Sequence, residues 1–199
     1  MMSAMDELTR LAVAARDGDR DALERFVRRA QADVWRLCRY LSDDGDADDL
    51  AQEALLRALR ALPAFRAEAS ARTWILGITQ RTCADNVRRR QRRRRLFERV
   101  TTTWQDQPVA DHAGLLAVNQ LVDTLDEDRR AAFVLTQIIG VSYDEAAAVL
   151  DCPIGTIRSR VARARVQLVT AMADGTDGGG TADCTDGGGT ADGPAAAGR

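Results

Sequence analysis

The chain has 199 residues, of which 45% are hydrophobic and 29% charged, and its formal net charge is −2. This length suits one or two small domains, and a net charge near zero excludes a surface that is basic all over. All 28 basic residues are arginine, and only 5% of the chain is aromatic, so alanine, leucine and arginine dominate. This composition favours helices, and we expect an all-α protein.

The sequence contains no segment typical of a signal peptide or a membrane span, so we expect a cytoplasmic protein with no membrane partner. Its four cysteines lack C-x-x-C spacing, and His112 is its single histidine. We therefore expect no metal site, no cofactor and no disulfide. Cys38 and Cys83 are interpreted as small core residues.

The N-terminal half predicts four helices, because its apolar residues recur at helical spacing between clear breaks. Pro63 ends the third helix, and a loop over residues 64–70 separates it from the fourth. The expected helices cover residues 7–16, 19–41 and 46–62, and the fourth runs from residue 71 into an arginine-rich segment.

Charge is concentrated in two blocks of this half. Residues 43–53 carry six acidic side chains and no basic one, whereas residues 81–99 carry nine arginines. The arginine block could neutralise several phosphates of a nucleic acid, although a solvated charge run has the same composition. In the acidic block, Asp49, Gln52 and Glu53 share one helical face, and Leu55, Leu59 and Leu62 are expected to fill the other.

Residues 101–112 lack helical periodicity and predict a linker, after which helices resume near residue 114. Thr124 and Glu127 have the T-x-x-E spacing of a capping box, which predicts the start of a helix that runs to Ile139.

Residues 140–165 predict a helix-turn-helix. Ser142 and Glu145 form the S-x-x-E capping box of its first helix, and Pro153 suits the first position of the second. The second helix has a buried stripe at helical spacing, formed by Ile157, Val161, Ala164 and Leu168. Its opposite face is small, polar and basic, which suits the approach of a helix to base edges in DNA. That face consists of Gly155, Thr156, Ser159, Ala162 and Arg163, with Arg158 on its flank.

From residue 174 the composition changes to Gly, Asp and Thr, with a tandem repeat (TDGGGTADC, then TDGGGTADG) that begins at Thr176. These residues cannot bury a core, so we expect a disordered tail.

Three segments, in chain order, resemble those of bacterial sigma factors. Residues 48–58 (DDLAQEALLRA) with residues 62–65 (LPAF) resemble the segment that binds RNA polymerase core. Residues 71–90 resemble the −10 region, and the helix-turn-helix resembles the −35 region. The resemblance spans residues 6–172. With only a linker between its two domains, the chain resembles the extracytoplasmic-function (ECF) sigma factors, and among them the actinobacterial C-type group.

The resemblance implies three sets of contacts. In similar proteins the loop over residues 65–70 captures a base flipped from the −10 element, and Trp74 follows it as either a base contact or a core residue. The contacts implied for the −10 element are Arg66, Glu68, Ser70, Trp74, Asn86, Arg89 and Arg90. Those implied for the −35 element are Thr156, Arg158, Ser159, Ala162 and Arg163, and those for core polymerase are Asp49, Gln52 and Glu53.

The domains implied are a region-2-like unit over residues 6–98, a linker over 99–113, a region-4-like unit over 114–173 and a tail over 174–199.

The implied function is promoter-specific transcription initiation with core polymerase and promoter DNA as partners, an anti-sigma factor as a possible third, and no small-molecule substrate. One alternative is a free-standing helix-turn-helix regulator, which needs neither the acidic face nor the Trp74 segment. Another is a sigma-like decoy that binds an anti-sigma factor. An enzyme is disfavoured, because the chain has no catalytic triad, metal-ligand cluster or phosphate-binding loop.

Overall fold

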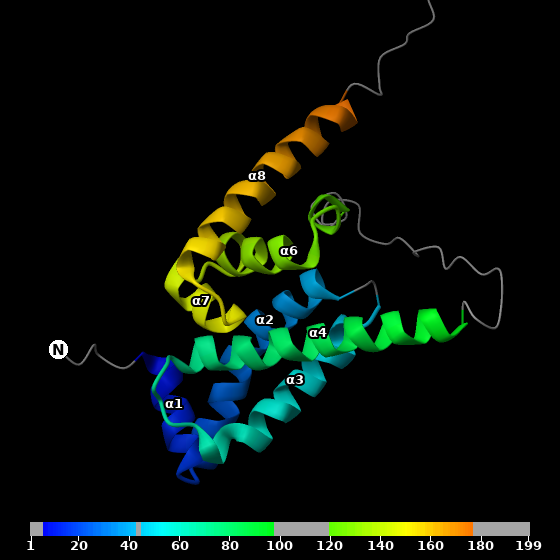
Figure 1. Ribbon diagram of the computed structural model, residues 1–199. Coiled ribbons are helices and arrows are strands. Elements are labelled where there is room, and N and C mark those ends of the chain that lie inside the picture. The colour runs from blue at the N-terminus through cyan, green and yellow to red at the C-terminus, as the bar shows by residue number, and fades with distance from the viewer. Residues whose placement is uncertain (1–5, 43–44, 98–119, 177–199) are drawn as a thin grey trace, which may run out of the picture.

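The computed structural model describes residues 6–42, 45–97 and 120–176, and within these ranges the regular structure is helical, as expected (Figure 1). Four of the named helices lie in the N-terminal half, and three, with an intervening π-helical turn, lie in the C-terminal half, where residues 120–123 are also helical. In chain order they are α1 (Glu7–Arg16), α2 (Arg20–Leu41), α3 (Ala47–Ala61), a 3₁₀ turn (Leu62–Ala64), α4 (Ala71–Phe97), α6 (Glu127–Phe133), a π-helical turn (Val134–Ile138), α7 (Tyr143–Leu150) and α8 (Ile154–Thr176).

Side-chain caps fix where the first two helices begin. The carboxylate of Asp6 accepts a hydrogen bond from the backbone N–H of Thr9, and that of Asp19 accepts one from Ala22, each at 3.0 Å. Each bond satisfies one of the backbone donors that the first turn of a helix leaves without an intrahelical partner. The predicted starts of these helices, and the end of α3 before Pro63, are confirmed to within one residue.

The N-terminal core forms where α1, α2, α3 and α4 pack together. Phe26, Val34 and Cys38 of α2 are buried there with Ile75 and Cys83 of α4. The two thiols are 3.7 Å apart, which confirms that both cysteines are core residues. Burial raises the pKa of Cys38, as does its contact with Cys83, which is the larger cause.

The prediction that leucines fill the inner face of α3 is only partly right. Ala51, Ala54 and Ala58 are buried there, whereas Leu55 and Leu59 are half-buried. Small residues let the backbone of α3 approach its neighbours closely, and the leucines then cover the edges of the contact.

The predicted capping box at Thr124 is wrong, because Asp126 caps α6 by accepting a hydrogen bond from the backbone N–H of Arg129 at 2.9 Å. The hydroxyl of Thr124 donates instead to the carbonyl of Leu121. The helix predicted to reach Ile139 also widens into a π-helical turn, whose last bond joins the N–H of Ile139 to the carbonyl of Val134 at 2.9 Å.

The helix-turn-helix of α7 and α8 has the predicted start. Ser142 and Glu145 form a complete capping box, with bonds of 3.2 Å and 2.9 Å. The chain then turns at Asp151, whose φ of 48° is left-handed, a conformation that aspartate tolerates better than most residues. Pro153 lies one position before α8, and its carbonyl accepts from the N–H of Thr156 at 2.8 Å.

The two predicted domains are in contact, because α7 packs along α4 (Figure 1). Leu37 of α2 and Leu76 of α4 are fully buried in the same hydrophobic cluster as Leu135 and Ile157 of the C-terminal half. Arg72 joins the halves further, since its guanidinium donates to the carboxylate of Asp33 at 2.7 Å and to the carbonyl of Ile139 at 2.8 Å.

The predicted linker over 99–113 lies outside the described residues, as does the repeat beyond Thr176; α8 itself continues to Thr176, two residues past the predicted start of the tail at 174. None of the helices within the described ranges is long and apolar enough to cross a membrane.

Candidate nucleic-acid and partner interfaces

The predicted DNA-reading face of α8 is on the surface. Arg158, Ser159, Ala162 and Arg163 are exposed, and Thr156 is half-buried. On the other side of the helix, Ile157, Val161 and Ala164 are no more than 1% exposed, and Leu168 is half-buried. The sequence therefore predicted correctly which side of this helix is exposed and which is buried.

The four arginines of α8 divide into two pairs, and the sequence alone gave no role to the pair that lies off the predicted DNA face, Arg160 and Arg165. Arg160 forms an ion pair with Asp128 of α6, and Arg165 donates to the side-chain oxygen of Gln137 at 2.7 Å. These two arginines hold α8 against the preceding helices. Arg158 and Arg163 lie on the exposed face, where they are available to phosphates or bases.

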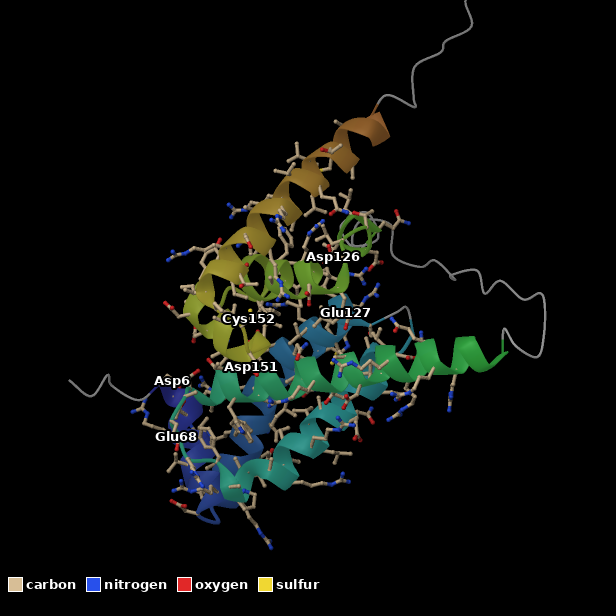
Figure 2. The ribbon with its side chains drawn as sticks, viewed as in Figure 1. Asp6, Glu68, Asp126, Glu127, Asp151 and Cys152 are labelled. Atoms are coloured by element: carbon tan, nitrogen blue, oxygen red, sulfur yellow. The ribbon has the colours of Figure 1, made fainter. Side chains whose placement is uncertain are left out.

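The loop before α4 is held at its base and exposed at its tip. Phe65 is buried, and its carbonyl accepts from the guanidinium of Arg16 at 3.1 Å. Arg66 and Glu68 have side chains that are 82% and 78% exposed and lie 3.8 Å apart. Figure 2 places Glu68 beside α1, at the end of α4 opposite the arginine-rich segment. Arg16, far away in sequence, was not foreseen as a residue that positions this loop.

Ser70 and Trp74 both make contacts within the fold. The hydroxyl of Ser70 accepts from the backbone N–H of Thr73 at 3.0 Å, as a cap of α4 does. Trp74 is half-buried, and its ring lies 4.9 Å from the ring of Phe65 at an angle of 45°. Trp74 therefore packs on the N-terminal core and against the ring of Phe65, the first residue of the loop.

The second group of predicted −10 contacts lies further along α4 and is held by one carboxylate. Asp46 accepts from the side-chain amide of Asn86 at 3.0 Å and pairs with the guanidinium of Arg90 at 2.6 Å. Arg89 is exposed beside them. Sixteen residues separate Ser70 from Asn86, or about 24 Å along a helix, so the two groups of predicted −10 residues lie at separate places.

The predicted polymerase-binding residues lie together on α3, where Asp49 and Gln52 are exposed and Glu53 is half-buried. The Glu53 carboxylate accepts from the guanidinium of Arg57 at 2.8 Å, and this bond holds the pKa of Glu53 below its usual range. Arg57 also pairs with Asp85 of α4 at 3.2 Å, so Glu53 is linked to α4 through a chain of charges.

A cleft of about 300 Å³ brings the two kinds of predicted contact together between α3 and α4. It is lined by Asp49 and Glu53 from the polymerase-binding set and by Asn86 and Arg89 from the −10 set. Sequence reasoning treated these sets as separate, because the residues are more than 30 positions apart. The structure makes them neighbours.

A second cleft, also of about 300 Å³, lies between α4 and the helix-turn-helix. Figure 2 shows Asp151 and Cys152 at the turn between α7 and α8 and Glu127 at the start of α6, all three among the residues that line it. Cys152 is half-buried there, 3.7 Å from the guanidinium of Arg160. Within the described residues, no cluster of His, Cys, Asp and Glu could hold a metal ion.

A helix-turn-helix with an exposed basic face on its second helix is typical of DNA-binding proteins, and the separate acidic face on α3 suits a protein partner. Sequence profiles narrow the class further. The profile described as Sigma-70 region 2 matches residues 26–93, and that described as Sigma-70, region 4 matches residues 115–168.

Known proteins agree with the profiles. The chain is 46% identical over 171 residues to the ECF RNA polymerase sigma factor SigC of Mycobacterium tuberculosis, covering 82% of this chain and 90% of the relative. It is 34% identical over 163 residues to the ECF RNA polymerase sigma-E factor of Escherichia coli, covering 74% of this chain and 85% of the relative. The chain therefore belongs to the ECF RNA polymerase sigma factors of the sigma-70 family.

Two solved structures are also similar. One is CnrH in complex with the cytosolic domain of CnrY, with a TM-score of 0.67 and 27% identity over 85% of this chain and 99% of that one. The other is the sigma factor RpoE in complex with the anti-sigma factor NepR from Bartonella quintana, with a TM-score of 0.66 and 26% identity over 76% of this chain and 96% of that one. As a sigma factor, the protein binds RNA polymerase core and promoter DNA and directs transcription initiation.

Proposed function

We propose that the exposed face of α8 reads the −35 element, with Arg158, Ser159, Ala162 and Arg163 at base edges and Thr156 at a phosphate. The observation that carries this assignment is the position of these side chains on one face of α8, whose opposite face is buried. An arginine can take guanine bidentately, and the small Ser159 and Ala162 let the helix approach the groove floor.

We propose that the N-terminal unit recognises and melts the −10 element. The exposed tip formed by Arg66 and Glu68, with the Trp74 ring and Ser70 behind it, receives a flipped base, and stacking contributes about 1–3 kcal/mol per base against the cost of unstacking. Asn86, Arg89 and Arg90 contact the adjoining strand. Melting needs only binding energy, because bases held outside the duplex stabilise the open form.

We propose that Asp49, Gln52 and Glu53 dock a basic segment of core polymerase, since they present carboxylates and an amide on one exposed helical face. Replacing Gln52 by Ala together with Glu53 by Arg tests this assignment. The double variant should keep its fold and lose core affinity, measured by competition against the parent protein. A double variant with parental affinity would exclude this face as the docking site.

We propose that residues 6–98 and 114–173 act as the −10 and −35 units, joined by the linker over 99–113 and followed by the tail from 174. The protein performs no covalent chemistry of its own, and it acts in the cytoplasm, where RNA polymerase and promoter DNA are. An anti-sigma factor is a further proposed partner, supported by the similarity to a sigma factor crystallised with one.

In vitro transcription tests the function as a whole, with purified bacterial core polymerase and a random-promoter library, with and without this protein. Protein-dependent initiation at sites that share two spaced elements is the expected result. Association with core without initiation would favour the decoy, and failure to associate with core would favour a free-standing regulator.

A further inference from the structure

Two large apolar side chains lie on the surface of the N-terminal domain. Trp35 of α2 is 44% exposed and Leu56 of α3 is 47% exposed. Among residues 6–42 and 45–93 they are the large hydrophobic residues with this degree of exposure. An exposed tryptophan is uncommon, because burial of its ring is strongly favourable, so the position of these two residues requires an explanation.

Both residues flank the acidic face of α3. The indole N–H of Trp35 donates to the carboxylate of Asp48 at 2.7 Å, and Asp48 is next to Asp49 and one turn before Gln52. Leu56 follows Gln52 by four positions and Glu53 by three, which places it on the same helical face. An apolar patch therefore borders the carboxylates at each end.

The hydrogen bond to Asp48 determines how a partner could use Trp35. Because the polar N–H already has an acceptor, the exposed ring offers its apolar face and its π-electrons. The bond also restricts the rotamer of the side chain, so less conformational entropy is lost when a partner binds. Such a ring suits an aliphatic side chain or the guanidinium of an arginine.

We propose that Trp35 and Leu56 are the apolar anchors of the surface that docks core polymerase, and that they receive a helix with basic residues on either side of an apolar seam. This inference rests on the proposed docking role of Asp49, Gln52 and Glu53. Asp48, Asp49 and Glu53 disfavour a nucleic acid, because its phosphates carry the same sign of charge. A basic protein helix matches both the carboxylates and the apolar ends, and binding energy in such interfaces is concentrated in a few aromatic and aliphatic contacts.

The test measures the affinity of the full chain for purified bacterial core polymerase by competition at two salt concentrations. Trp35→Ala should weaken binding about tenfold and Leu56→Ala about threefold to tenfold, as expected for aromatic and aliphatic side chains that anchor an interface. Trp35→Phe, which keeps an aromatic face without the N–H, should stay within about threefold of the parent. Thr170→Ala on α8 is the control, because the side chain of Thr170 is exposed, small and neutral and lies in the other half of the chain, and this variant should bind as the parent does.

Salt separates the anchors from the charges around them. The loss in Trp35→Ala should be equal at both salt concentrations, because the side chain is neutral, whereas the variant that carries Glu53→Arg should change the salt dependence. Thermal unfolding and binding to −35 DNA show that each variant is folded, and Leu56→Ala decides the question if Trp35→Ala does not fold.

Parental affinity in both alanine variants would overturn the proposal, and so would a loss in Trp35→Phe as large as that in Trp35→Ala. If the Gln52 and Glu53 double variant loses core binding while Trp35→Ala and Leu56→Ala do not, only the anchors are wrong. If all of these variants bind as the parent does, the docking face itself is wrong.

Discussion

The two regions proposed to contact DNA present their side chains in different ways. On α8 the residues proposed to read the −35 element lie on an exposed face, while Arg160 and Arg165 of the same helix are engaged with Asp128 and Gln137. On α4, by contrast, Asn86 and Arg90 are themselves engaged with Asp46. In the proposed function, the face on α8 could therefore meet DNA as it stands, whereas Asn86 and Arg90 would exchange the carboxylate of Asp46 for a phosphate or a base.

The largest effect on stability should come from the buried residues on which the exposed face of α8 rests. Ile157 is fully buried beneath it, so Ile157→Ala should lower the free energy of unfolding by about 2–5 kcal/mol through lost contacts and a residual cavity. Thermal and denaturant unfolding followed by circular dichroism would measure the change. Val166→Ala, on the exposed side of the same helix, should change stability by less than about 0.5 kcal/mol. Equal effects of the two substitutions would mean that α8 does not pack as described.

Removal of a reading residue should act on recognition and leave stability unchanged. Arg163→Ala should weaken binding to −35 DNA by about 1–3 kcal/mol, the contribution of a bidentate base contact, with a smaller loss on scrambled DNA. Fluorescence anisotropy with both DNAs measures the difference. The control is Arg165→Ala, which removes the same charge from an arginine that is bonded to Gln137. If Arg163→Ala weakens binding to −35 DNA and to scrambled DNA equally, Arg163 contacts only a phosphate and does not read a base.

The exchange proposed for α4 can be tested by removal of the carboxylate. Asp46→Ala should raise affinity for −10 single-stranded DNA a few-fold, by less than about 1 kcal/mol, because Asn86 and Arg90 then bind DNA without first giving up the carboxylate of Asp46. Helix α3 should persist, since the side chain of Asp46 makes no capping bond. Asp21→Ala removes one negative charge from an exposed site on α2 and controls for net charge. Unchanged or lower affinity in Asp46→Ala would show that Asp46 does not compete with DNA.

The smallest effect concerns Glu145, which both caps α7 and lies 3.4 Å from the hydroxyl of Thr73 on α4. Bonds from Ser142, first of all from its backbone N–H, hold the pKa of Glu145 below its usual range despite partial burial. A lowered pKa in the folded state means that this stabilisation is present above the unfolded pKa, near pH 4, and is lost as pH falls through the folded value.

Glu145→Gln should therefore lower stability at neutral pH by about 0.5–1 kcal/mol, with solvent exposure limiting the effect, and the difference from the parent should vanish in acid. Melting temperatures across the acid range measure it, with Asp144→Asn as the control at an exposed neighbour. A difference that persists unchanged at low pH would mean that the charge of Glu145 is not what stabilises α7.

Much of this protein follows from local sequence, because helix periodicity and caps depend on residues within a few positions of one another. Asp6, Asp19 and the Ser142–Glu145 box fix three helix starts, and the stripe from Ile157 fixes which face of α8 is exposed. The Thr124 prediction failed at the same level, because Asp126 competes for the same backbone donors and lies in the better position.

Tertiary structure decided what depends on residues far apart in the chain. Which arginines of α8 are structural depends on where Asp128 and Gln137 come to lie, and the partners of Asn86 and Arg90 depend on the packing of α3 against α4. The contact between the halves, with Leu37 and Leu76 in the C-terminal cluster, has no local signal, since periodicity marks a residue as buried without naming its neighbours. Sequence thus determined where the helices lie and which of their faces are exposed. Three-dimensional packing determined which helix faces contact one another.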